Sequence, residues 1–172
     1  MNSNRSSGRS SPTRPTIIEK ELSYVIVGAF LRVYNALGFG FLESIYARAL
    51  EIVLKALGLR VDREYPIPVY FEGHQIGFHR VDMLVERKIV IEIKSTERLA
   101  EGAKRQLRSY VTAADLELGL LLHFGPEPNS YRILGRHRSN ARESIRPHLT
   151  DSDQAVRGPG ALNSTPDSAS TP

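Results

Sequence analysis

The sequence predicts an α/β domain in which helices flank a mixed β-sheet. Two kinds of pattern support this fold class: apolar residues recur every three or four positions in three segments, and short runs rich in branched residues lie between those segments. The predicted order along the chain is two helices, three strands, one helix and two strands. Elements arranged in this order pack as layers around one hydrophobic core.

The helices are predicted from the spacing of their apolar residues. Glycines follow the first two, Gly38 and Gly58, and glycine is a common residue just beyond the end of a helix. The predicted helices span residues 18–37, 42–57 and 98–114.

The strands are predicted from their branched and aromatic residues. Short turns at residues 72–74 and 86–88 separate the first three strands, and the pair Gly125 and Pro126 separates the last two. The predicted strands span residues 66–71, 75–85, 88–94, 118–124 and 131–134.

One folded domain is predicted, over residues 17–135. With 172 residues and 41% hydrophobic content, the chain can bury one core of ordinary size. Residues 1–16 are rich in Ser, Arg and Pro, and residues 136–172 have too few large apolar side chains to offset the entropy lost on folding. Both ends are therefore predicted to be disordered tails.

The composition excludes several kinds of site. The chain has no cysteine, which excludes disulfides, thiolate metal ligands and cysteine nucleophiles. Its apolar runs fall far short of the roughly 20 residues that a membrane-spanning helix needs. No apolar segment of signal-peptide type follows the basic N-terminus. We therefore expect a soluble, cytoplasmic protein that has no membrane partner.

The positive charge lies mostly outside the predicted domain. The formal net charge is +4, and residues 1–16 carry three arginines and no acidic residue. Residues 17–138 hold 17 Lys and Arg against 15 Asp and Glu, so this part is only mildly basic. Basic clusters can bind phosphates, but a solvated basic tail explains the same composition.

Two polar residues interrupt the apolar faces of their helices. On a helical wheel, Glu43 projects among the apolar residues of the second helix, whereas Arg48, Glu51 and Lys55 fall on the opposite, solvent-facing side. Gln106 similarly falls inside the apolar arc of the third helix. Each residue could be a buried polar group with a partner, or part of a shared polar site.

A strand pair places three more charged residues together. Because side chains alternate along a strand, Glu92 and Lys94 share a face with Val90. If the turn before this strand has three residues, 86–88, Asp82 of the preceding strand lies opposite Glu92. A turn of two residues would direct one of the carboxylates to the other face.

Opposed carboxylates repel each other, and a bound cation would offset this repulsion. Mg²⁺ takes oxygen ligands, which Asp82 and Glu92 can supply. A lysine two residues further on the same face can position or deprotonate a water, or offset charge in a phosphoryl transition state. The alternative is an ordinary amphipathic strand whose Glu92 and Lys94 face water.

In this order and spacing, these residues resemble a known family. The turn and helix Gly38-Phe39-Gly40-Phe41-Leu42-Glu43-Ser44-Ile45-Tyr46 look like the GxxExxY signature, and residues 79–95 with residues 106–110 are similar to the rest of such proteins. That family is placed in the PD-(D/E)XK nuclease superfamily. The resemblance covers nearly all of residues 17–133 and implies a restriction-endonuclease-like core, αβββαβ, with a mixed central sheet flanked by helices.

The resemblance also implies roles for individual residues. Asp82 and Glu92 match the metal-binding acidic pair, and Glu43 matches the helix glutamate that joins the metal site in many members. Lys94 matches the motif lysine, which would activate water, and Gln106 matches a glutamine that would position a ligand or phosphate. The proline in the name of the superfamily is replaced by Val81, a common departure.

The function implied by the resemblance is Mg²⁺- or Mn²⁺-dependent hydrolysis of phosphodiester bonds in DNA or RNA. The alternative, favoured by the weak positive charge of residues 17–138, is a catalytically inactive module on the same fold that binds nucleic acid or another protein. A nucleic-acid partner is expected in the first case. The number of subunits stays open, with a homodimer as one alternative.

Overall fold

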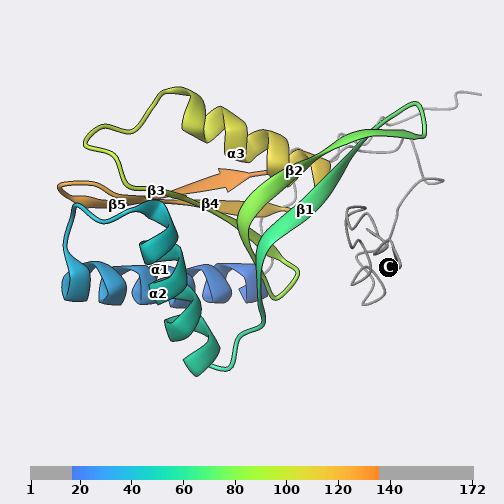
Figure 1. Cartoon of the computed structure of the whole chain (residues 1–172). Coiled ribbons are helices and arrows are strands. Elements are labelled where there is room, and N and C mark those ends of the chain that lie inside the picture. Colours follow the sequence, from blue (N-terminus) through green and yellow to red (C-terminus); the bar gives the residue numbers. More distant parts are fainter. Residues whose placement is uncertain (1–16, 136–172) are drawn as a thin grey trace, which may run out of the picture. The chain divides into compact units, whose positions relative to one another are not determined.

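The structure, a computed structural model, describes residues 17–135; the two predicted tails, 1–16 and 136–172, lie outside the described residues. Three helices and five strands follow one another in the predicted order (Figure 1). They are α1 Ile17–Leu37, α2 Glu43–Ala56, β1 Val61–Phe71, β2 His74–Val85, β3 Ile89–Lys94, α3 Gly102–Ala113, β4 Leu118–Phe124 and β5 Pro128–Leu134.

The strands form one mixed sheet in the order β1-β2-β3-β4-β5. Neighbouring strands are antiparallel except for β3 and β4, which are parallel because α3 connects them as a crossover. Together with the flanking helices, this arrangement is an α/β fold of the restriction-endonuclease-like type. The predicted fold class is thus confirmed.

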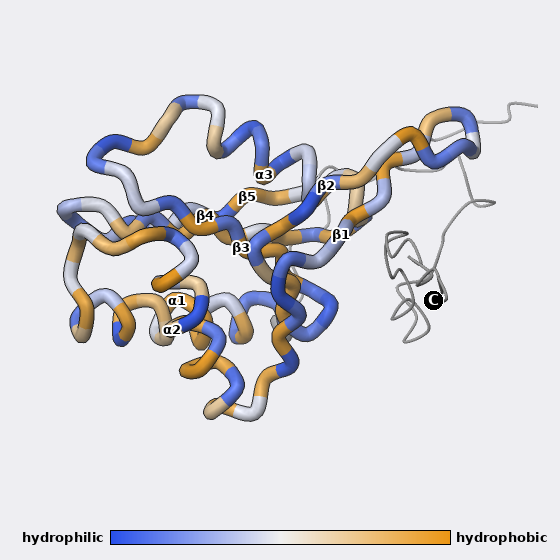
Figure 2. The backbone as a smooth tube through the Cα atoms, viewed as in Figure 1, coloured by the Kyte–Doolittle hydropathy of each residue, from blue (hydrophilic) through white to orange (hydrophobic). Residues whose placement is uncertain are grey.

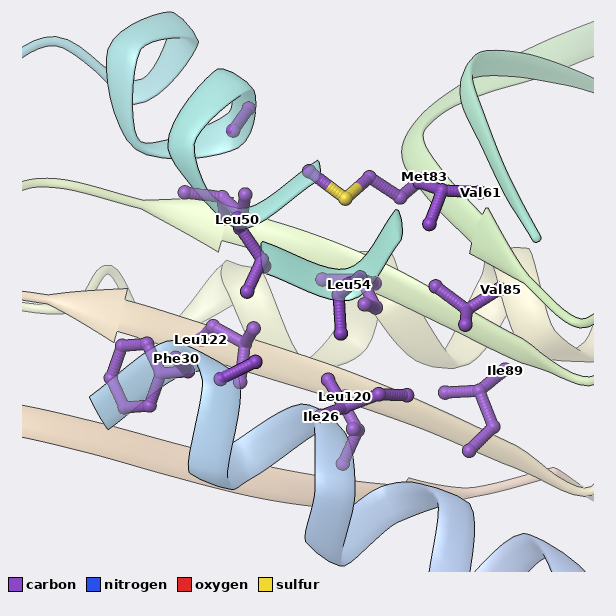
Figure 3. Packing of buried hydrophobic residues seen from close by; sticks show 14 of the residues in the cluster. Ile26, Phe30, Leu50, Leu54, Val61, Met83, Val85, Ile89, Leu120 and Leu122 are labelled. Carbon is purple, nitrogen blue, oxygen red and sulfur yellow. The ribbon is translucent and has the colours of Figure 1, made fainter. Parts of the chain in front are cut away.

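Helices cover both faces of the sheet: α1 and α2 pack on one face and α3 packs on the other (Figure 1). Ile26 and Phe30 of α1 meet Leu50 and Leu54 of α2 over the first face (Figure 3). All four side chains are buried. Burial of one such side chain contributes about 1.5–3 kcal/mol, so this layer is a main source of stability.

Strand β3 is buried along nearly all of its length. Its isoleucines, such as Ile91, join the cluster under α1 and α2, whereas Val90 joins Leu107 and Val111 of α3 on the other face. Figure 2 shows hydrophobic and hydrophilic residues mixed along the β1–β2 hairpin, in whose outer part Phe71, Ile76 and Phe78 are exposed. The predicted alternation of faces along β3 is confirmed.

Two elements differ most from their predicted extent. Strand β1 begins at Val61, because Val61 and Tyr65 pair with Val85 and Val81 of β2 despite the polar residues between them. Helix α3 begins at Gly102 rather than at residue 98, because residues 96–98 form a turn in which the Thr96 hydroxyl donates to the Arg98 carbonyl at 2.9 Å. Tertiary pairing and a side-chain hydrogen bond thus override the local pattern.

The prediction for Glu51 was wrong. This residue was placed on the solvent-facing side of α2, yet it is only 6% exposed. Its carboxylate pairs with Arg48 at 2.8 Å, Lys55 at 2.7 Å and Arg63 of β1 at 3.7 Å. The hydrogen bond from Lys55 lowers the pKa of Glu51. The early start of β1 brings Arg63 to this face of α2, and the long basic side chains cover the carboxylate.

Gly119→Ala is expected to destabilise the fold by about 1–3 kcal/mol, measured by chemical denaturation. A Cβ at Gly119 of β4 would lie 2.5 Å from Cγ2 of Val111 and 2.9 Å from Cδ1 of Leu107, both buried on α3. The branched Val111 has little freedom to move aside. Gly28→Ala is the control, because a Cβ there meets no atom within 4 Å. Equal stability of the Gly119 variant and the wild type would contradict this packing.

No helix within residues 17–135 is long and apolar enough to cross a membrane.

Candidate active site

The register between β2 and β3 positions the acidic pair. Val85 pairs with Ile89 and Met83 pairs with Ile91, so the connecting turn has the three predicted residues, 86–88. The Lys88 amide donates to the Val85 carbonyl at 2.9 Å and closes this turn. Extending the register by one residue places Asp82 opposite Glu92, where the paired region ends.

Asp82 does not continue the strand pairing but contacts the backbone of β3. Its Oδ2 accepts a hydrogen bond from the Ile93 amide at 2.6 Å, one residue beyond Glu92. Burial raises the pKa of Asp82, the Ile93 hydrogen bond opposes this shift, and the nearby carboxylate of Glu43 adds to it. Asp82 is thus fixed beside Glu92 in an environment that disfavours its negative charge.

Glu92 is the most deeply buried acid of the group, at 4% exposure. Burial and the charge of Asp82, with a smaller effect of Glu43, raise its pKa to about 7. Lys94 on the same face donates to Glu92 Oε1 at 2.7 Å and opposes the shift. One ammonium group therefore faces three carboxylates, and the cluster favours additional positive charge.

Lys94 keeps its proton in this arrangement. Burial alone would lower its pKa, but the hydrogen bond to Glu92 and the charges of Glu92, Glu43 and Asp82 outweigh burial, and the pKa of Lys94 is raised. The group is a cation throughout the neutral pH range.

Glu43 comes from a different part of the fold. It is the first residue of α2, and its Oε1 accepts from the Ser95 amide, directly after Lys94, at 3.2 Å. Its charge contributes to the pKa shifts of Asp82, Glu92 and Lys94. The structure therefore brings together four of the five residues singled out in the sequence, from α2, β2 and β3.

Gln106 differs from its expected position. It is exposed at the margin of α3 rather than within the apolar face, and its amide donates to the hydroxyl of Tyr110 one turn later. Tyr110 is buried and packs against the His79 ring at 4.7 Å. Burial raises the pKa of Tyr110, and the charges of Glu92 and Asp82 raise it further. Gln106 thus contacts a tyrosine whose pKa responds to the charges of the acidic cluster.

Sequence reasoning missed three residues around the cluster. The sequence pattern places Tyr110 only among the apolar residues of its helix. Residues four positions apart on a helix are neighbours, so the spacing from Gln106 already indicates a contact between the two side chains. Arg63, whose charge lowers the pKa of Asp82, lay outside the predicted strand. His123 of β4 carried no motif; it is buried, and its Nε2 lies 2.7 Å from the Thr96 carbonyl, in the turn after β3.

The carboxylates each contact a separate partner. Asp82 accepts from Ile93, Glu43 from Ser95, and Glu92 from Lys94. In residues 17–135, no three His, Asp or Glu side chains lie close enough together, in their present conformations, to hold one metal ion. The donors nevertheless fit Mg²⁺ or Mn²⁺, because all three are hard oxygen ligands and their mutual repulsion disfavours the ionised cluster without a cation.

Residues 20–133 match the family model of the PD-(D/E)XK nuclease superfamily. The match includes all five residues singled out above. The chain therefore belongs to the PD-(D/E)XK nuclease superfamily. Proteins of this superfamily typically use divalent metal ions.

Among solved structures, the chain is similar to the one described as "Crystal structure of SSO0001", at 28% sequence identity and a TM-score of 0.42. The alignment covers 68% of this chain and 59% of that chain, so the sequence spans less than two thirds of that protein. None of the curated proteins matches the sequence.

Raising the pH from 5 to 8 without divalent cations is expected to destabilise the wild type by about 2 kcal/mol more than Glu92→Gln. The pKa of Glu92 is about 7 in the folded protein, against an ordinary value of 4.5, so the folded state binds the proton more tightly than the unfolded chain does. The stability from this group is complete below about pH 4.5 and is lost as the pH rises through about 7. Chemical denaturation in EDTA at both pH values measures the difference.

Glu64→Gln serves as the control, because Glu64 is exposed and its contact with Arg80 is long, at 3.4 Å. It should lose the same stability as the wild type between the two pH values. A wild type and a Glu92→Gln variant that respond equally to pH would contradict the electrostatic description of the cluster.

Proposed function

We propose that this protein is a Mg²⁺- or Mn²⁺-dependent nuclease of the GxxExxY group that hydrolyses phosphodiester bonds of DNA or RNA. The observation that carries the proposal is the convergence of Glu43, Asp82, Glu92 and Lys94 from three elements on one end of the sheet. Membership in the nuclease superfamily supports the same chemistry.

Asp82, Glu92 and Glu43 would hold the cation. A bound divalent cation would polarise the phosphate and provide a nucleophilic water at neutral pH. Asp82 is fixed by the Ile93 amide, whereas Glu92 would exchange its contact with Lys94 for the cation. The pKa of Glu92, about 7, supports stronger cation binding above neutral pH, where this carboxyl loses its proton.

Lys94 would act as a cation. Burial lowers its pKa, but the hydrogen bond to Glu92 and the nearby carboxylates outweigh burial and favour the ammonium form in the cluster without a bound metal ion. The ammonium would orient the attacking water or offset negative charge on the phosphate.

Gln106 would position the substrate or a phosphate from the margin of α3. Its side chain is exposed and is oriented by the hydroxyl of Tyr110, which lies within the electrostatic influence of Glu92 and Asp82. An exposed amide beside an acidic cluster can donate to a phosphate oxygen without itself binding the cation.

A binding module without turnover is the second candidate. It is favoured by the nearly balanced charge of residues 17–138 and by the separate partner that each carboxylate has in the structure. In that case the chain would bind nucleic acid, but added Mg²⁺ or Mn²⁺ would produce no cleavage.

A metal titration combined with a cleavage assay tests the proposal. The full chain is incubated with single-stranded, duplex and structured DNA and RNA, with EDTA, Mg²⁺ or Mn²⁺. We expect cleavage of at least one substrate that depends on the cation. Binding without cleavage of any substrate would favour the binding module, and absence of both would reject the two functions together.

A further inference from the structure

We infer that Tyr46 is a positioning residue that holds Glu43 in the site by locking the turn in front of α2. This inference rests on the proposed function, since it concerns a side chain proposed to bind the cation. Tyr46 lies three residues after Glu43, inside the fold, and its hydroxyl reaches back to the turn that delivers Glu43.

The hydroxyl of Tyr46 makes two hydrogen bonds to that turn. It donates to the Gly38 carbonyl at 2.6 Å and accepts from the Phe41 amide at 3.2 Å. These two backbone groups lie at either end of the chain reversal between α1 and α2. A single hydroxyl therefore bridges the reversal and satisfies two backbone groups that neither helix uses.

The ring of Tyr46 fixes the hydroxyl to the rigid part of the fold. Tyr46 is fully buried, and its ring stacks on Phe124 of β4 with centroids 4.1 Å apart and an angle of 17° between the planes. The ring of Phe30 in α1 packs edge-on against the same Phe124 at 4.7 Å. The hydroxyl that holds the turn is thus attached to a ring packed among the buried aromatic residues Phe30 and Phe124.

The backbone of the turn needs such an anchor. Gly38 and Gly40 have φ angles of +69° and +115°, and the second value lies in a region that residues with a Cβ rarely adopt. Residue Leu42, the N-cap of α2, makes no side-chain hydrogen bond to the helix. The hydroxyl of Tyr46 therefore replaces the restraint that a capping side chain would usually supply.

The position of the Glu43 side chain depends directly on the conformation of this turn. It follows the N-cap residue, and its carboxylate accepts a hydrogen bond from the Ser95 amide of the site at 3.2 Å. A shift of the turn by a fraction of an ångström would move the carboxylate away from Asp82 and Glu92. Loss of supporting contacts of this kind typically weakens metal binding about 10- to 100-fold.

The test compares two Tyr→Phe variants that lose similar hydrogen bonds. Tyr46→Phe keeps the stacked ring but removes both contacts to the turn. Tyr34→Phe is the matched control: the Tyr34 hydroxyl donates to the carbonyls of Gly125 and Pro126 at 3.1 and 2.7 Å, and its ring also faces Phe124, at 6.4 Å. Both variants are made in the wild type and in Glu43→Gln.

Titration calorimetry with Mn²⁺ separates positioning from general destabilisation. Tyr46→Phe should weaken Mn²⁺ binding about 10-fold in the wild type and less than twofold in the Glu43→Gln background, because its effect passes through Glu43. Tyr34→Phe should leave the affinity unchanged in both backgrounds. Equal losses from Tyr46→Phe in both backgrounds, or equal losses from the two tyrosine variants, would overturn the inference.

Hydrogen exchange of the Ser95 amide gives a readout that needs no metal. Tyr46→Phe should accelerate exchange at Ser95 more than Tyr34→Phe does, because the hydrogen bond to Glu43 loosens. If the wild type binds neither Mg²⁺ nor Mn²⁺, the proposed function fails, but the exchange experiment still tests whether Tyr46 positions Glu43. Unchanged exchange at Ser95 in Tyr46→Phe would overturn this inference about Tyr46. Gly40→Ala, which strains the same turn and leaves Tyr46 in place, should reproduce the faster exchange.

Discussion

Asp82→Asn is expected to reduce cation-dependent cleavage about a thousandfold, because it removes one negative ligand of the cation. Loss of about 4 kcal/mol of transition-state stabilisation corresponds to this factor. The fold should persist, since the asparagine oxygen can still accept from the buried Ile93 amide at the position of Asp82 Oδ2. Alanine would leave that amide without its partner and would add about 1–3 kcal/mol of instability. Initial rates of cleavage at saturating Mn²⁺ measure the effect.

Asp62→Asn is the matched control. Asp62 lies on β1 and forms ion pairs with Arg60 and Arg87, outside the cluster. Its substitution removes the same charge and should change the cleavage rate less than threefold. A folded Asp82→Asn variant with wild-type activity would show that cleavage does not require this carboxylate.

The second large effect is expected for Lys94→Met. Methionine keeps the length of the buried stem and removes the charge, so the rate should fall about 100- to 1,000-fold as the charge-stabilising group disappears. The affinity for Mn²⁺ should stay the same or rise, because the carboxylates lose a competing cation at 2.7 Å from Glu92. Single-turnover kinetics and calorimetry measure the two quantities separately.

This division between rate and affinity distinguishes the role of Lys94 from those of the acidic residues. Lys88→Met, in the exposed turn between β2 and β3, is the control and should affect neither quantity. Weaker binding of Mn²⁺ to Lys94→Met, with an unchanged rate at saturation, would contradict the electrostatic role proposed for this residue.

The position of Asp82 beside Glu92 could be predicted because it depends on few local features. Alternation along β3 fixes the face of Glu92 and Lys94, and the length of one turn fixes the register. The turn has the three predicted residues, and the pairing of Val85 with Ile89 follows from it. A local pattern is sufficient when the elements concerned are consecutive in the chain.

Contacts between distant segments could not be predicted in the same way. Glu51 is buried because Arg63 arrives from β1, and a helical wheel contains no information about that strand. Gln106 is exposed although its helical-wheel position lies among apolar residues, because the wheel does not show which part of α3 the sheet covers. The contact of Glu43 with Ser95 joins residues 52 positions apart, and only the packed fold brings them together.

The central claim, that Glu43, Asp82 and Glu92 form a cation site, is tested most directly by titration calorimetry of the full chain with Mg²⁺ and Mn²⁺. At pH 8, Glu92 has lost its proton, since its pKa is about 7. We expect saturable binding of one ion per chain by the wild type and at least tenfold weaker binding by Asp82→Asn. A wild type that binds neither ion, or an Asp82→Asn variant that binds equally well, would contradict the account.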